Sequence, residues 1–285
     1  MEAERAPGML RRLVRLWRLY ATLDLIWLAR DARQALLWSL SDMVTSAAGV
    51  AATLLIAERF AGIGPWSRPQ VMFLMGYALT VEGILVMFFS NNILHISRRV
   101  GRGQLDHILT QPQPIWAAFL TEGFCPFTGS AVLAAGLALL GWATVRLGLA
   151  VSPSWAAAAA LNLAASTAVA LSFSFLWASL AFWAPRAAEE ISSSAVDIIV
   201  QLKRFPLDGL GPLLRLGLLT CLPAGLTAWL PCRYLLGQAR GVWAAAVTPL
   251  AGLLFVALAA WAFRKGLEHY GRTGSQRYSS FGHRR

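Results

Sequence analysis

The sequence contains little charge and almost no lysine. Only 14% of its 285 residues are charged, whereas 57% are hydrophobic. Soluble globular domains carry about 25% charged residues, so this composition excludes an ordinary soluble domain. Neither of the two lysines, Lys203 and Lys265, follows a glycine. This excludes the G-x-x-x-x-G-K-[ST] phosphate loop of an ATPase, which needs a lysine at that place to hold the phosphates.

The sequence also lacks the spacings that metal and thiol chemistry require. Its three cysteines, Cys125, Cys221 and Cys232, form no C-x-x-C pair, and its four histidines are scattered. No metal site is predicted. Cys221 and Cys232 could lie on the same outer face and pair, but we favour free thiols. No G-x-S-x-G nucleophile elbow and no complete dinucleotide-binding glycine loop is present either.

What the sequence does contain is long apolar runs. About 20 consecutive apolar residues span a bilayer as a helix, so we predict an all-α polytopic membrane protein with six transmembrane helices. The expected spans lie near residues 36–57, 71–94, 115–145, 155–183, 188–205 and 242–263, within a transmembrane domain of residues 35–264. Pro126 interrupts the third span. Several prolines follow the fifth, and we expect broken or re-entrant helices between spans five and six.

The N-terminal residues 1–34 predict an amphipathic helix at the membrane interface. Within Leu10–Asp31, Arg11, Arg15 and Arg18 share one helical face, and Leu13 and Trp17 lie on the opposite face. Such a helix rests among the lipid headgroups with its apolar face toward the acyl chains. The alternative is a solvated helix that leads into the first span.

The net charge of +11 has two interpretations. Basic surfaces bind nucleic acid, but basic residues next to spans also mark the cytoplasmic side of a membrane protein. With six spans, most of the 25 basic residues fall on the side of both termini, so we predict an N-in, C-in orientation and no nucleic-acid partner. Residues 265–285 are expected to form a basic cytoplasmic tail. The arginine-rich, lysine-poor usage favours a bacterial inner membrane.

Five polar residues within or next to the spans are candidates for a translocation path. An ionisable group at the centre of a bilayer costs about 2.5–3.5 kcal/mol on insertion scales, so it usually faces a cavity or a partner. The candidates are Glu82, Asn91, Asn92, Glu122 and Asp197. The alternative for each acidic residue is a structural pairing with a neighbouring helix.

The polar loop 98–112, RRVGRGQLDHILTQP, separates the second and third spans. Its Gln104–Leu109 segment can form a short helix between the glycines before it and Pro112 after it. A rigid cytoplasmic helix that joins two spans can transmit force from a soluble partner. The alternative is an ordinary loop with topogenic arginines.

This loop resembles that of ABC-2 type exporter permeases, in the subgroup whose loop after span two reads roughly R-R-G-E-L-D-x-x-L-x-x-P. Residues 101–112 read G-R-G-Q-L-D-H-I-L-T-Q-P, with Gln104 in place of the usual acid. A second similarity is Phe205-Pro206-Leu207 at the exit of the fifth span, with Pro223 and Pro231 after it. The resemblance implies that the loop docks on an ATP-binding subunit through Arg98, Arg99, Arg102, Gly103, Gln104, Leu105 and Asp106.

The resemblance also implies a function. It is that of a non-catalytic permease subunit of an ATP-driven exporter, which would form the path with a second permease, identical or related. No cofactor is expected in this chain, because ATP and Mg would bind the separate ATPase. The expected cargo is an amphiphilic or cationic small molecule, a lipid or a peptide. The alternative is a secondary transporter or channel that uses the acidic in-span residues, but such folds often contain paired repeats, and only one broken region is evident here.

Overall fold

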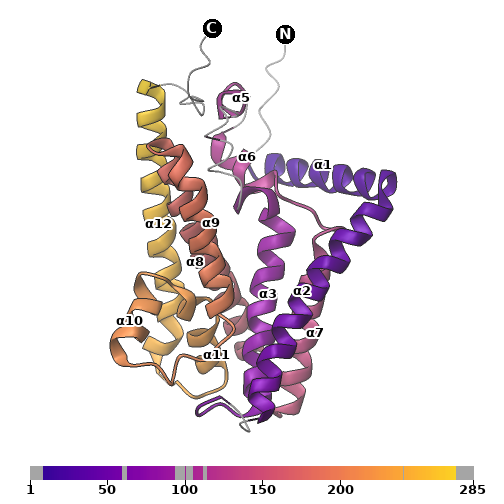
Figure 1. Cartoon of the computed structure of the whole chain (residues 1–285), viewed down its shortest axis with the longest axis vertical. Coiled ribbons are helices and arrows are strands. Elements are labelled where there is room, and N and C mark those ends of the chain that lie inside the picture. Colours follow the sequence, from indigo (N-terminus) through magenta and orange to yellow (C-terminus); the bar gives the residue numbers. More distant parts are fainter. Residues whose placement is uncertain are drawn as a thin grey trace.

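A computed structural model describes residues 9–59, 63–93, 100, 105–111, 114–239 and 241–273. Apart from one isolated bridge between Ile63 and Trp66, every regular element in these residues is a helix, which confirms the all-α prediction (Figure 1). The elements are α1 (Met9–Arg30), α2 (Ala32–Arg59), α3 (Arg68–Ile93), α5 (Leu105–Leu109), α6 (Ile115–Thr121), α7 (Ser130–Arg146), α8 (Pro153–Ala178), η1 (Ser179–Phe182), α9 (Pro185–Leu202), α10 (Pro212–Thr220), η2 (Gly225–Trp229), α11 (Leu230–Leu235) and α12 (Val242–Thr273).

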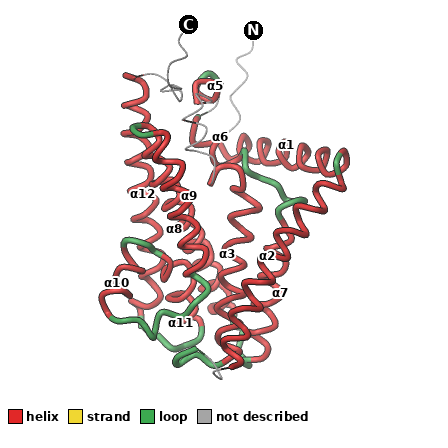
Figure 2. The backbone as a smooth tube through the Cα atoms, viewed as in Figure 1, coloured by secondary structure: helices red, strands yellow, loops and turns green. Residues whose placement is uncertain are grey.

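The long helices run side by side along one axis, and α1 lies across one end of them (Figures 1 and 2). The C-terminal end of α12 lies at that same end, whereas α10 and α11 lie at the opposite end. Four helices of the described part, namely α2, α3, α12 and α8 with its η1 extension, are long and apolar enough to cross a bilayer. The protein is therefore a multi-pass membrane protein. The number of six spans and their orientation stay predictions.

The third predicted span, residues 115–145, is divided into two helices. α6 ends at Thr121 and α7 begins at Ser130. Pro126 lies in this break and has no N–H to donate, as the sequence predicted. The link is attached to α3 instead, because the Cys125 N–H donates to the Met87 carbonyl at 2.8 Å.

The C-terminal part of α12 differs from the predicted tail, since the helix continues to Thr273. Gly266 lies directly under the Phe182 ring, where a Cβ atom would be 2.1 Å from the ring. Tyr270 is buried one turn further on. The segment is thus packed against the bundle although its composition is basic.

The region after α9 consists of short broken helices, and whether they are re-entrant stays a prediction. α10 and the η2–α11 pair form an apolar unit bent by 82°, and both α10 and α11 lie at the end of the bundle opposite to α1 (Figure 1). Asp208 holds this region together: its carboxylate accepts hydrogen bonds from the indole N–H groups of Trp66 and Trp229 and lies 3.6 Å from Arg233. Irregular backbone is tolerated at membrane depth only where its polar groups are satisfied by protein or by water in a cavity. Here the Arg215 guanidinium donates to the Asp208 and Leu210 carbonyls.

Helices α3 and α7 approach each other closely through glycines. A Cβ atom at Gly136 of α7 would lie 2.5 Å from the Thr80 nitrogen of α3, and one at Gly83 of α3 would lie 2.3 Å from the Leu133 Cα of α7. Lipid provides no hydrophobic force between helices, so membrane helices associate through this kind of close backbone packing at small residues.

We therefore expect Gly136→Ala to lower thermal stability, since the added methyl must push the two backbones apart. Such overpacking costs about 1–3 kcal/mol. Gly141→Ala is the matched control on α7, because nothing lies within 4 Å of a Cβ atom there. Thermal unfolding of both variants in the same detergent measures the difference, and equal midpoints would contradict this packing.

Candidate functional site

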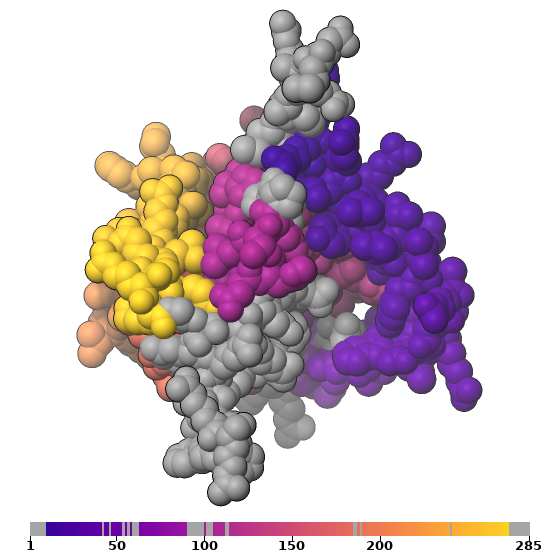
Figure 3. Space-filling view, turned by 90° about the horizontal axis from the view of Figure 1, so that it is seen from above, coloured from indigo at the N-terminus to yellow at the C-terminus, as the bar shows by residue number. Residues whose placement is uncertain are grey.

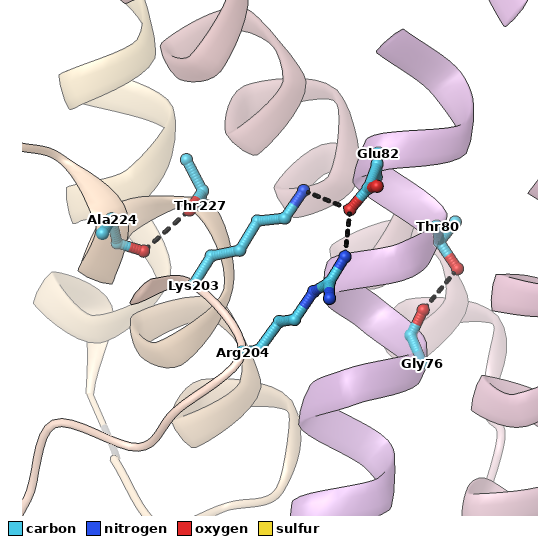
Figure 4. A network of polar contacts seen from close by, with 7 residues as sticks. All are labelled: Gly76, Thr80, Glu82, Lys203, Arg204, Ala224 and Thr227. Atoms are coloured by element: carbon cyan, nitrogen blue, oxygen red, sulfur yellow. Dashed lines mark hydrogen bonds and ion pairs between the residues drawn. The ribbon is translucent and has the colours of Figure 1, made fainter. Parts of the chain in front are cut away.

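A cluster of three charged side chains lies inside the bundle, between α3 and the end of α9. The Glu82 carboxylate is 3.0 Å from the Lys203 ammonium and 3.3 Å from the Arg204 guanidinium. Both cations reach toward Glu82 from the end of α9, as Figure 4 shows. The Lys203 side chain is only 3% exposed. Such burial is tolerable because each cation has the carboxylate as its partner.

Helix α2 is shaped to admit this cluster. A Cβ atom at Gly49 would lie 2.0 Å from a guanidinium nitrogen of Arg204, so a larger residue there would require the Arg204 side chain to move. With two cations and one anion, the cluster carries a formal charge of about +1. Glu82 therefore adopts the structural pairing that was the alternative for it, and its role in a path stays a prediction.

The other path candidates lie in different surroundings. Asn91 and Asn92 belong to the last turn of α3, but their side chains lie outside the described residues. Glu122 follows α6 and lines a cavity beneath α1, whereas Asp197 lies on the exposed face of α9. The structure does not gather Glu82, Glu122 and Asp197 into one site.

The predicted docking helix forms as α5. Its Leu105 and Ile108 side chains are buried in a cluster that includes Phe182 of η1 and Tyr270 of α12. The Tyr270 hydroxyl donates to the Asp106 carboxylate at 2.6 Å. Figure 3 shows the magenta surface of α5 and α6 between the yellow end of α12 and the indigo α1. Arg98, Arg99, Arg102, Gly103 and Gln104 lie outside the described residues.

Sequence reasoning missed the partners of α5 and of Glu82. Tyr270 lies in the segment expected to be a tail, although its spacing of four residues from Gly266 puts both on one helical face. Lys203 and Arg204 lie at the end of the fifth predicted span and were counted among the basic residues of the outer side. An acidic residue predicted within a span usually pairs with a basic residue. Lys203 is one of only two lysines in the sequence, and this rarity was the signal that could have identified it as the partner of Glu82.

A comparison with known protein families identifies the family to which this arrangement of helices belongs. The sequence profile of the ABC-2 family transporter proteins matches residues 43–274, which is well over half of the chain. The chain belongs to this family. No curated protein and no solved structure gives a significant match. The resemblance seen in loop 98–112 is therefore confirmed at the level of the family, and the loop subgroup stays a prediction.

Membership defines the general role of the chain. ABC-2 family proteins are the membrane components of ABC transporters. These membrane components are generally non-catalytic and associate with an ABC ATPase. In this ABC-2 permease, the described residues contain no group of three or more His, Cys, Asp or Glu side chains able to hold a metal ion.

In the charge cluster of the ABC-2 permease, removing the negative charge should destabilise the protein more than removing one positive charge. We expect Glu82→Gln to destabilise the protein by about 3–5 kcal/mol, the cost of leaving buried charge unpaired, because two cations then face each other. Lys203→Met should cost less, since it leaves the balanced pair of Glu82 and Arg204. Thermal unfolding in detergent measures both.

The control for Lys203→Met is Lys265→Met. Lys265 pairs with Glu268 at 2.9 Å, but both side chains are more than half exposed, and exposed pairs contribute little. If Glu82→Gln unfolds at the same temperature as Lys203→Met, the balance of charge in the cluster is not what stabilises it.

Proposed function

We propose that this chain is a non-catalytic permease subunit of an ATP-driven exporter and that the outer face of α9 lines the translocation path. The observation that carries this proposal is the polar surface of α9. Glu190, Ser194, Asp197 and Gln201 recur at intervals of three or four residues and are all exposed, so they lie on one side of the helix.

Contact between such a polar face and the lipid hydrocarbon is unfavourable. α9 has 18 residues, yet its composition leaves it out of the helices apolar enough to cross a membrane by themselves. Its opposite side is buried through Ala188, Ser192, Ala195 and Ile199. A polar stripe along a helix within a bundle fits a water-filled cavity or a second subunit better than hydrocarbon.

A second permease, identical or related, would cover this face and complete the path. The carboxylates of Glu190 and Asp197 favour cationic cargo, and the exposed Ile191 and Ile198 on adjacent positions favour an apolar part. An amphiphilic cation, a lipid or a peptide suits this mixture. Glu82 is less suited to the proton relay of a secondary transporter, because its carboxylate already contacts two cations.

Coupling to the ATPase would occur through loop 98–112. α5 lies at the end of the bundle where α1 and the C-terminal end of α12 also lie (Figure 1). Its hydrogen bond to Tyr270 and its buried Leu105 and Ile108 fix it on the bundle. ATP and Mg would bind the partner subunit, whose closure would push α5 and move the helices as rigid bodies.

The path is tested with single cysteines on α9 in a background where Cys125, Cys221 and Cys232 are alanine. We expect Ser194→Cys to react with a membrane-impermeant thiol reagent, because the position faces water. Ser192→Cys is the matched control two residues away, at a side chain only 3% exposed. Labelling in sealed proteoliposomes is the measurement. A Ser194→Cys variant as unreactive as the Ser192→Cys variant would contradict an aqueous path.

The coupling is tested with Asp106→Arg in the complex with its ATPase. We expect ATP-driven transport to fall at least tenfold while the inserted amount stays the same, because the new cation replaces the acceptor of the Tyr270 hydroxyl. His107→Arg, at the next exposed position of α5, also introduces an arginine but leaves that bond in place. Normal transport by Asp106→Arg would contradict this coupling and would indicate that the loop is only a linker.

A further inference from the structure

We propose that the cavity beneath α1 binds the ammonium group of an amphiphile, a site separate from the face of α9. The cavity has a volume of about 440 Å³ and lies between α1, the start of α2, α3 and the link from α6 to α7. Ligand sites typically measure about 300–1,000 Å³, so it can hold a headgroup.

Its walls combine aromatic rings with carboxylates. Tyr20 and Trp27 of α1 and Trp38 of α2 contribute rings, and Asp24 and Glu122 contribute carboxylates. An ammonium group is attracted to the faces of such rings, and aromatic cages recognise quaternary ammonium groups in this way. None of the described residues that line the cavity is Lys, Arg or His. The chemistry of the lining therefore selects a cation.

The walls are held in place by hydrogen bonds that do not need a ligand. The Asp24 carboxylate accepts from the Phe127 N–H at 2.8 Å and from the N–H and hydroxyl of Thr128 at 3.2 and 2.7 Å. Cys125 of the same link donates its N–H to Met87 of α3. The site is consequently pre-organised, which lowers the entropy lost on binding.

The position of the cavity indicates that the ligand carries an acyl chain. α1 has the amphipathic pattern of a helix that lies among lipid headgroups, and the cavity is lined both by α1 and by α2, which is long and apolar enough to cross a bilayer. Trp27 and Trp38 are 41% and 63% exposed, so the aromatic rim reaches the surface. An ammonium group can enter there while its apolar tail stays in the bilayer. The source is either a membrane lipid such as phosphatidylethanolamine or a free amphiphilic cation.

The test is native mass spectrometry of the full chain released from nanodiscs that contain equal amounts of phosphatidylethanolamine and phosphatidylglycerol. We expect phosphatidylethanolamine to be retained in preference. Trp38→Leu and Glu122→Gln should each reduce that retention by about three- to tenfold, the range of one cation–π contact or charge contact. Trp261→Leu is the matched control, because Trp261 is 62% exposed but lies on α12, away from the cavity.

A second arm separates the two sources of the ammonium group. The protein in a maltoside detergent is titrated with dodecyltrimethylammonium, and with dodecyl sulfate as the anionic control of equal chain length. Retained phosphatidylethanolamine identifies a membrane lipid as the ligand. Binding of dodecyltrimethylammonium alone, sensitive to Trp38→Leu, identifies a free amphiphilic cation. If neither binds in preference to its anionic counterpart, or if Trp38→Leu and Trp261→Leu behave alike, the proposal is wrong. None of these readouts requires transport, so they stand apart from the path along α9.

Discussion

The contact of Glu82 with Lys203 and Arg204 determines where α9 ends, and much of the architecture depends on it. α3 begins at Arg68, at the end of the bundle opposite to α1, and Glu82 lies about 21 Å along it at 1.5 Å per residue. A buried carboxylate needs its counter-charge within a few ångströms. The residues that supply it directly follow α9, so α9 stops inside the bundle rather than at the far surface, and other segments must fill the remaining depth.

Those segments are α10, η2 and α11, and they bring their own polar groups. Asp208 accepts from two tryptophans and lies beside Arg233, while Arg215 donates to the Asp208 carbonyl at 2.9 Å. Several basic residues that sequence counting assigned to the outer side are thus internal partners of Glu82 and Asp208. Removing them from that side leaves fewer free cations there.

The sequence predicted what depends on local composition. The apolar runs, the helix α1, the break at Pro126 and the broken helices after α9 all follow from hydrophobicity and proline within short windows. Local patterns did not predict contacts between distant residues, such as Lys203 with Glu82 or Tyr270 with Asp106, because a short window of sequence does not reveal which distant polar side chains meet. The end of α12 was predicted as a tail for the same reason. A basic amphipathic helix has one composition whether it is docked or solvated.

These contacts together make α9 the element that connects the end of the bundle near α5 with the middle of α3. α5 shares a buried cluster with Phe182 of η1 and is hydrogen-bonded to Tyr270 of α12, and α9 begins three residues after Phe182. At its other end α9 is attached to the middle of α3 through Glu82. A displacement of α5 by a docked subunit would reach α9 through the buried cluster that α5 shares with η1. Since packed helices move as rigid bodies between discrete arrangements, the polar face of α9 would turn with that displacement relative to α3. The charge cluster would then serve as the pivot.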